Sequence, residues 1–390
     1  MSNILILGGS FIQSNFVNRA ILDGHNILVV DRDSECYCNK NYPNLNFVQC
    51  DFSNYSRVRN IFNDNHFDFA YSPSTEIGNL ICANLSKEFG FLYNDISVVN
   101  NTLNKSLMKK CLVKSKNVKN IPDYDIKKLK RNMWSFPVIV KPVDSSGGRG
   151  VSIVNQEGEL GDAIKFAQNY SRNPPIVEKY VKGVQLSIET VTFNGQHSIV
   201  AVTSEFIVGE TSRVERSHEI SKNIHDKYFN LIQQSIQEIL DIFKIKVGPS
   251  HIEIIVIEDT NEIYLIEIAS RAGAFRDELI DISVGVHFNE LIIKSYQGRE
   301  KADDFYVPKK SAMVNLLQSE SDIDFVSSLE RSDKHEKTVI LKPVLDKAAI
   351  DMTEVIGYSY FSGNGRLDDC NLAKCLKLDR YKINDIGAKI

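Results

Sequence analysis

The sequence has few cysteines, and no apolar run in it is long enough to cross a membrane. The seven cysteines are odd in number and none has Cys-x-x-Cys spacing, which excludes the disulfide framework of a secreted protein and favours a reducing cytosol. No apolar run reaches the roughly 18 residues that span a bilayer. The 46 basic and 50 acidic residues nearly balance, so no charge excess favours nucleic acid or an anionic membrane. We therefore expect a cytoplasmic protein with neither partner.

The chain has enough apolar residues to bury several cores. It has 390 residues, of which 43% are hydrophobic and 25% charged, values close to the average of soluble globular proteins. At about 150 residues per domain, this length predicts two or three domains.

The N-terminal part alternates between apolar runs and helical stretches. Residues 4–7 are apolar and end at Gly8-Gly9, a helical stretch follows, and residues 27–30 form a second apolar run that ends at Asp31. Such runs are typical of buried parallel strands with helices on both faces. We therefore predict a doubly wound parallel sheet over roughly the first 100 residues.

Further along, the pattern favours strands and one long helix. Strands are expected at residues 138–141, 151–154, 176–180, 186–193, 252–257 and 263–268. The last two are joined by a short polar turn, which predicts an antiparallel hairpin. Residues 228–243 place their apolar side chains on one face, as an amphipathic helix does.

A glycine-rich stretch between two of these strands has the composition of a phosphate-binding loop. It reads SSGGRG over residues 145–150, and Lys141 ends the strand before it. Glycines let successive N–H groups approach a phosphate, and the lysine can neutralise its charge. The candidate contacts of the loop are Ser146, Gly147, Gly148 and Gly150. A flexible hairpin loop has the same composition, so both interpretations stay open.

Two glutamates interrupt the apolar strands of the expected hairpin. Glu253 and Glu267 lie one on each strand, and alternation puts them on one face if the register sets them opposite. Like charges repel there unless a cation lies between them, and carboxylate oxygens suit Mg²⁺ on nucleotide phosphates. Arg271 and Arg276 follow and could hold a phosphoryl group or an oxyanion. Two solvent-facing glutamates are the alternative.

A charged residue also interrupts the strand at residues 176–180. Glu178 stands between apolar neighbours, where a charge is costly unless it meets water, another charge or a ligand. A purine ring could donate a hydrogen bond to this carboxylate. A surface strand has the same pattern.

Taken in order, these motifs resemble those of the ATP-grasp superfamily, specifically its carboxylate–amine ligases, such as D-alanine–D-alanine ligase, L-amino-acid ligases and carbamoyl-phosphate synthetase. The resemblance covers roughly residues 1–300 and implies that Lys105 and Lys141 contact the nucleotide. It implies an adenine hinge that includes Glu178, Lys179 and Val181. It places Gln185 where the family has a ribose-binding glutamate, and Ala269 where it has a metal-binding asparagine.

The resemblance also implies a fold and a domain organisation. The fold class would be α/β and α+β, an ATP-grasp fold with an N-terminal Rossmann-like parallel sheet, a small lid and an antiparallel core. The expected domains are an N-terminal domain at 1–103, a lid at 104–182, a core that carries the metal carboxylates at 183–304, and a C-terminal subdomain at 305–390.

The implied activity is an ATP-dependent, ADP-forming ligation of a small carboxylate, such as an amino acid, to an amine through an acyl phosphate. The implied cofactors are ATP and Mg²⁺, with Mn²⁺ as the alternative metal. Glu253 and Glu267 would be the metal ligands, and Arg271, Lys141 and Glu267 the catalytic residues. A homodimer is the default expectation.

Five residues are candidates for substrate recognition. Arg213, Arg216 and His218 lie in a polar stretch between the lid and the hairpin. They could clamp a carboxylate or move a proton, and each could equally be a surface residue. Glu76 follows a strand end, where open α/β sheets bind ligands, and could recognise the amine. Arg276 is the fifth.

Parts of the sequence are compatible with two other functions. The opening also resembles a nucleotide-sugar epimerase or reductase, in which Asp31 would hold a ribose hydroxyl and Tyr124 and Lys128 would match the catalytic pair. Ser10 and Gln13 stand where that fingerprint needs glycines, which counts against this function. The second alternative is a nucleotide-binding protein without ligase activity, for which Ala269 is the hint.

Overall fold

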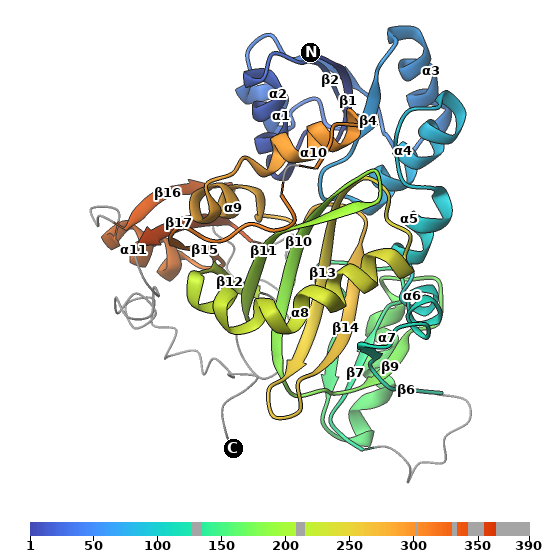
Figure 1. Cartoon of the computed structure of the whole chain (residues 1–390), viewed down its shortest axis with the longest axis vertical. Coiled ribbons are helices and arrows are strands. Elements are labelled where there is room, and N and C mark those ends of the chain that lie inside the picture. Colours follow the sequence, from blue (N-terminus) through green and yellow to red (C-terminus); the bar gives the residue numbers. More distant parts are fainter. Residues whose placement is uncertain (126–134, 208–214, 302, 330–333, 342–354, 364–390) are drawn as a thin grey trace.

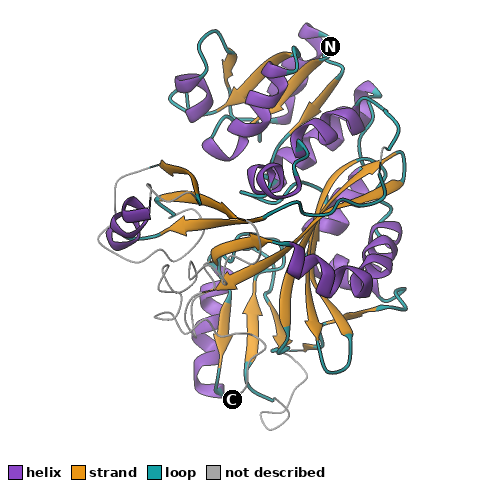
Figure 2. Cartoon of the chain, turned by 60° about the vertical axis from the view of Figure 1, so that its left-hand side comes forward, coloured by secondary structure: helices purple, strands orange, loops and turns teal. Residues whose placement is uncertain are grey.

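The protein is described from a computed structural model that covers residues 1–125, 135–207, 215–301, 303–329, 334–341 and 355–363. In this part of the chain, three sheets are arranged as an N-terminal layer, a long central sheet and a small lid sheet (Figure 1). Helices and strands mix throughout, as the secondary-structure view shows (Figure 2). The expected combination of a parallel N-terminal sheet with antiparallel sheets is confirmed. Among the described residues, no helix has both the length and the hydropathy to cross a membrane.

The N-terminal sheet is parallel and has the strand order β3-β2-β1-β4. Its strands are β1 (Asn3–Leu7), β2 (Asn26–Asp31), β3 (Asn46–Gln49) and β4 (Phe69–Tyr71). Its helices are α1 (Phe11–Leu22), α2 (Tyr37–Asn41), α3 (Tyr55–Asn65) and α4 (Glu76–Phe89). The apolar run of β1 is buried because neighbouring strands and helices cover it. Two further helices, α5 (Ile96–Leu103) and α6 (Lys105–Leu112), lead away from this layer.

The lid sheet is antiparallel and has the strand order β6-β9-β7-β8. Its strands are β6 (Asp123–Tyr124), β7 (Val138–Lys141), β8 (Ser152–Val154) and β9 (Ile176–Lys179). Valines of these strands pack against alanines of α7 (Leu160–Gln168) to form a small separate core. The lid therefore has little apolar area to bury and is a small unit beside the central sheet.

The central sheet has the strand order β16-β17-β15-β12-β11-β10-β13-β14-β5. Its strands are β5 (Val118–Asn120), β10 (Val184–Phe193), β11 (Gln196–Ile207), β12 (Glu215–Ile220), β13 (Gly248–Ile257), β14 (Glu262–Ala269), β15 (Ser311–Leu317), β16 (His335–Ile340) and β17 (Gly357–Gly363). The associated helices are α8 (Lys222–Ile242), α9 (Asp277–Val284), α10 (Phe288–Tyr296) and α11 (Glu320–Leu329). The proposed domain boundaries stay a prediction, and strands from both 104–182 and 305–390 pair into this one sheet.

The two faces of the central sheet differ in chemistry. Alternate residues such as Leu186, Ile252 and Ile254 pack with the apolar side of α8 (Figure 1). The residues between them include Glu189 and Glu253, which therefore point to the opposite face. One face is an apolar core, and the other carries charged side chains.

Two expectations about this region need adjustment. The helix expected at residues 228–243 is α8, which begins earlier because Ser221 caps it by accepting a hydrogen bond from the Ile224 N–H. The polar stretch that holds Arg216 and His218 is strand β12, with His218 fully buried, because its polar side chains have partners inside the protein. Arg213 lies outside the described residues.

Aromatic rings fix the N-terminal layer to the central sheet. Tyr296 of α10 stacks on Phe69 with ring centroids 5.4 Å apart and on Tyr93 with centroids 5.3 Å apart. All three rings are buried. These contacts fix β4 and the segment after α4 to α10, which itself packs on β10 and β13 of the central sheet.

The start of α4 also depends on one glycine. A Cβ atom at Gly78 would lie 1.9 Å from Oγ of Ser72, whose hydroxyl donates to the Leu7 carbonyl at 2.8 Å. We expect Gly78→Ala to displace Ser72 and lower the free energy of unfolding by about 1–3 kcal/mol. The measurement is the urea midpoint followed by circular dichroism.

Gly161→Ala is the matched control, because a Cβ atom at Gly161 on α7 meets nothing within 4 Å. It should leave stability unchanged or raise it by up to ~1 kcal/mol, since alanine has the higher helix propensity. Equal effects of the two substitutions would contradict the packing argument.

Candidate active site

A cavity of about 170 Å³ lies between the lid and the central sheet. Apolar side chains of both sheets line it, among them Ile121, Ile139, Ile255 and Ile266. The candidate residues that line it are Lys105, Lys141, Ser146, Gly147, Gly148, Glu178, Lys179, Val181, Gln185, Glu253 and Glu267. Apolar walls with polar groups at one end suit a flat ring that carries charged substituents.

The glycine loop forms one wall of the cavity. Gly147, Gly148 and Gly150 have φ values of 64°, 71° and 75°, the left-handed region that glycine adopts without strain. Gly150 is not among the lining residues, and a Cβ atom there would lie 2.8 Å from both Pro142 and Tyr170. Gly150 is thus needed for packing, while the loop residues before it face the cavity.

Lys141 at the cavity is held by a buried carboxylate, that of Glu178. Lys141 Nζ lies 2.6 Å and Lys109 Nζ 2.7 Å from the two oxygens of Glu178. Burial would raise the pKa of Glu178, but the two lysines outweigh it and lower that pKa. Glu178, expected to accept from a purine, is in this structure the counter-ion that positions Lys141.

Lys105 reaches the cavity from the first turn of α6. Asn104 caps this helix by accepting from the N–H groups of Ser106 and Leu107. Lys105 Nζ lies 2.9 Å from Glu267 and donates to the Ser145 carbonyl at 2.8 Å. One ammonium group therefore connects the glycine loop to the carboxylates of the central sheet.

Glu253 and Glu267 are register partners on β13 and β14, the opposite placement on which the expected metal site depends. Burial would raise the pKa of Glu267, but Lys105 outweighs it and lowers the pKa to about 2. Burial and the charge of Glu267 raise the pKa of Glu253 to about 7. Two half-buried carboxylates that repel each other fit a divalent cation between them.

The arginines approach from the segment after β14. Arg271 Nη2 lies 2.7 Å from Glu76 at the N-terminus of α4, 195 residues away in sequence. Arg276 Nη2 lies 2.7 Å from Glu205 and also contacts the His218 ring. Burial and Arg276 lower the pKa of His218, which favours a neutral ring. Glu76, Arg271, Arg276 and His218 are therefore not free surface residues. Each has a charged or polar partner inside the protein.

Arg216 contacts the C-terminal part of the chain. Its Nη1 donates to Oδ2 of Asp322 on α11 at 2.8 Å, and both residues are buried. The same carboxylate accepts from the N–H groups of Gln318 and Ser319. This ion pair attaches α11 to β12.

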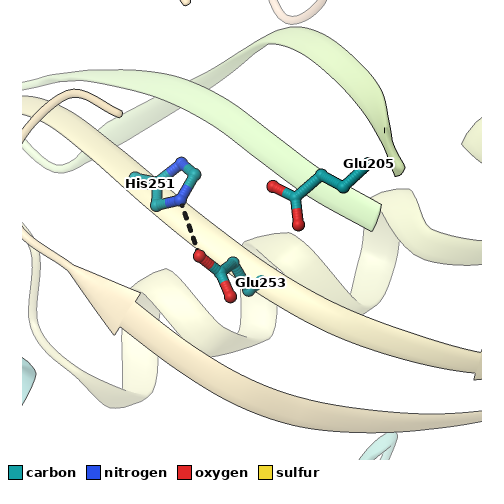
Figure 3. A group of neighbouring side chains, drawn as sticks. All are labelled: Glu205, His251 and Glu253. Atoms are coloured by element: carbon teal, nitrogen blue, oxygen red, sulfur yellow. Dashed lines mark hydrogen bonds and ion pairs between the residues drawn. The ribbon is translucent and has the colours of Figure 1, made fainter. Parts of the chain in front are cut away.

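Sequence reasoning did not single out three residues on the polar face, Glu189, Glu205 and His251 (Figure 3 shows the last two beside Glu253). His251 Nδ1 contacts Glu189, and its Nε2 lies 3.1 Å from Glu253. Burial would lower the pKa of His251, but Glu189 and Glu253 raise it to about 10. The only sequence signal was polar–apolar alternation along the strands, which also describes an exposed face.

Among the described residues of the epimerase alternative, Asp31 and Tyr124 lie in different sheets. The Asp31 carboxylate accepts the Gly9 N–H at 2.8 Å, and a Cβ atom at Gly9 would lie 2.6 Å from Cys36 Sγ. Tyr124 lies in the lid sheet, and Lys128 is outside the described residues. The turn after β1 is therefore filled by the chain's own side chains.

The repulsion at Glu253 yields a stability prediction. In protein freed of divalent metal, Glu253→Gln should raise the free energy of unfolding at pH 8 by about 1–3 kcal/mol, because it removes one of two half-buried like charges. With a folded pKa near 7 against an ordinary 4.5, the cost of the charge appears as pH rises through that window. Most of the gain should vanish at pH 5, as measured by urea unfolding.

Glu262→Gln, at the exposed end of the same hairpin and paired with Lys119, should change stability little at either pH. A Glu253→Gln variant that is destabilised at pH 8 would show that the carboxylate pair is not under repulsion.

Comparison with known proteins assigns this architecture. Residues 134–276 match the model of the ATP-grasp domain, and residues 4–103 match that of the NAD dependent epimerase/dehydratase family. The D-alanine–D-alanine ligase of Buchnera aphidicola subsp. Schizaphis graminum is 27% identical over 177 residues, which are 44% of this chain and 56% of that protein. The matched region thus spans about half the length of this relative.

Two solved structures resemble the whole chain in fold. The L-amino acid ligase from Bacillus licheniformis superposes with a TM-score of 0.81 at 16% identity, over 98% of each chain. The N5-carboxyaminoimidazole synthetase from Staphylococcus aureus complexed with ADP has a TM-score of 0.75 at 16% identity, over 96% of this chain and 97% of that one. The resemblance to ATP-grasp ligases is confirmed: the chain carries an ATP-grasp domain within an ATP-grasp fold.

Proposed function

We propose that the protein is an ATP-dependent, ADP-forming carboxylate–amine ligase. The observation that carries this proposal is the convergence, around one cavity, of a glycine loop, two lysines and a pair of opposed, half-buried carboxylates. The relatives named above include ligases of amino acids, which supports the same chemistry. ATP and a divalent metal are the cofactors of this proposal, with Mg²⁺ expected and Mn²⁺ as the alternative.

In the proposed reaction, a substrate carboxylate oxygen attacks the γ-phosphorus of ATP, which gives an acyl phosphate and ADP. The amine then attacks the acyl carbon, phosphate leaves, and the amine loses a proton. Lys105 and Lys141 would offset the charge of the triphosphate. Glu253 and Glu267 would hold the metal, which neutralises the phosphate oxygens when bound. The glycine loop would close over the phosphates and exclude water from the acyl phosphate.

The Glu76–Arg271 ion pair supports an amino acid as a substrate. An amino acid carries an ammonium and a carboxylate close together, so it can replace this pair by binding Glu76 and Arg271 with its own opposite charges. Both groups are largely buried, which strengthens such contacts. Arg276 and His218 would line the same acid-binding region. Arg213 stays a candidate from the sequence alone.

The first test mixes the protein with Mg-ATP, pools of amino acids and small carboxylates, and hydroxylamine. ADP with an equal amount of hydroxamate is the expected result, because hydroxylamine traps the acyl phosphate. AMP with pyrophosphate would contradict the proposal. Nucleotide binding without turnover in every pool would favour the alternative of a binding protein that has lost ligation.

Glu76→Gln tests the substrate contact. We expect kcat/KM for the amino acid to fall 10–100-fold, because a charged hydrogen bond contributes about 1.5–3 kcal/mol, while ATP affinity stays unchanged. Glu88→Gln is the control, since Glu88 lies on the same helix and pairs with Arg59 on the surface. Equal activities of both variants and the parent would exclude Glu76 from the substrate site.

A further inference from the structure

We propose that Glu205, His251 and Glu253 form a binding site for a divalent transition-metal ion, with one nitrogen and two carboxylate ligands. One ligand atom from each residue lies within 4.8 Å of the other two. His251 and Glu253 point from β13 toward Glu205 on β11 (Figure 3). Among the described residues, this is the one group of its kind.

One nitrogen of the His251 ring contacts a carboxylate, the arrangement that is typical of a metal-binding histidine. Its Nδ1 contacts the carboxylate of Glu189, which is fully buried and also accepts the Gly273 N–H at 3.1 Å. A carboxylate on one ring nitrogen fixes the ring and its tautomer and raises the basicity of the other nitrogen. The other ring nitrogen, Nε2, lies 3.1 Å from the Glu253 carboxylate, so a metal ion bound there would separate these two ligand atoms.

Glu205 keeps the capacity to bind a metal in addition to its present partners. Its Oε1 accepts from Arg276 at 2.7 Å and its Oε2 accepts from Gln185 at 2.6 Å. A carboxylate has about four lone-pair positions, so each oxygen can still accept one more partner. The existing hydrogen bonds orient the carboxylate toward the cluster.

The local charge also favours a dication. The carboxylates of Glu189, Glu205, Glu215 and Glu253 all act on the buried guanidinium of Arg276. Glu267 adds a further carboxylate beside Glu253, and Lys105 and Arg271 act on it. A divalent cation offsets most of the remaining negative charge.

On the neighbouring strand, β14, the side chain opposite His251 does not compete with this ring for a metal ion. The register partner of His251 is Ala269, a side chain without a ligand atom. An imidazole nitrogen discriminates against Mg²⁺, which prefers oxygen, and favours ions such as Mn²⁺, Co²⁺ or Zn²⁺ over it. The site shares Glu253 with the expected Mg²⁺ pair. Its use in ligation rests on the proposed function, whereas its ability to bind metal does not.

The test is Mn²⁺ titration of the full chain without nucleotide, followed by electron spin-echo measurement of nitrogen coupling to the bound ion. We expect one Mn²⁺ with coupling to a single imidazole nitrogen. In His251→Gln the coupling should disappear and the affinity should fall 10–100-fold. The control His287→Gln, an exposed histidine away from this cluster, should keep both.

Glu205→Gln gives a second variant that keeps the histidine, and it should weaken Mn²⁺ binding while the nitrogen coupling persists. Bound Mn²⁺ with oxygen ligands only, or no bound Mn²⁺ in the parent protein, overturns the proposal whether or not either variant folds. The hydroxamate assay is independent of this result: nitrogen-coordinated Mn²⁺ without hydroxamate would favour the binding protein over the ligase and leave the metal site in place.

Discussion

Buried negative charge on one face of the central sheet is the constraint on which the site depends. Glu189, Glu205, Glu253 and Glu267 stand on strands whose other face is an apolar core against α8. Such charges cannot remain in a protein without partners. Lys105 of α6, His251 of β13 and Arg276 after β14 supply those partners. The cations of the site therefore also offset the free-energy cost of burying these carboxylates in the fold.

The partners are not equivalent, and this sets the chemistry. Lys105 satisfies Glu267, so the pKa of that carboxyl falls, while Glu253 remains under repulsion and its pKa rises. Glu267 is thus charged at neutral pH, whereas the protonation of Glu253 depends on the charges beside it. A bound cation would remove that asymmetry.

Local pattern predicted much of this arrangement. Alternation in the hairpin pointed to Glu253 and Glu267, and the composition of residues 145–150 pointed to the loop that lines the cavity. The polar–apolar pattern gave the wrong exposure where polar side chains find partners inside the folded protein. Strand β12 is polar along its length, yet it is buried because its side chains pair with residues from distant parts of the chain, such as Asp322. His251 was missed for the same reason, since Glu189 and Glu253 make it a charged, buried ring.

The C-terminal strands have a consequence for how the protein can be divided. β15 pairs with β12, and β17 and β16 continue outward from it, so these strands cover an edge of the central sheet. A chain shortened before β15 would leave the N–H and C=O groups of β12 exposed along that edge, a template for pairing with another molecule. Strands β15, β16 and β17 thus protect the protein from edge-to-edge aggregation. A protein prepared without them would be expected to precipitate.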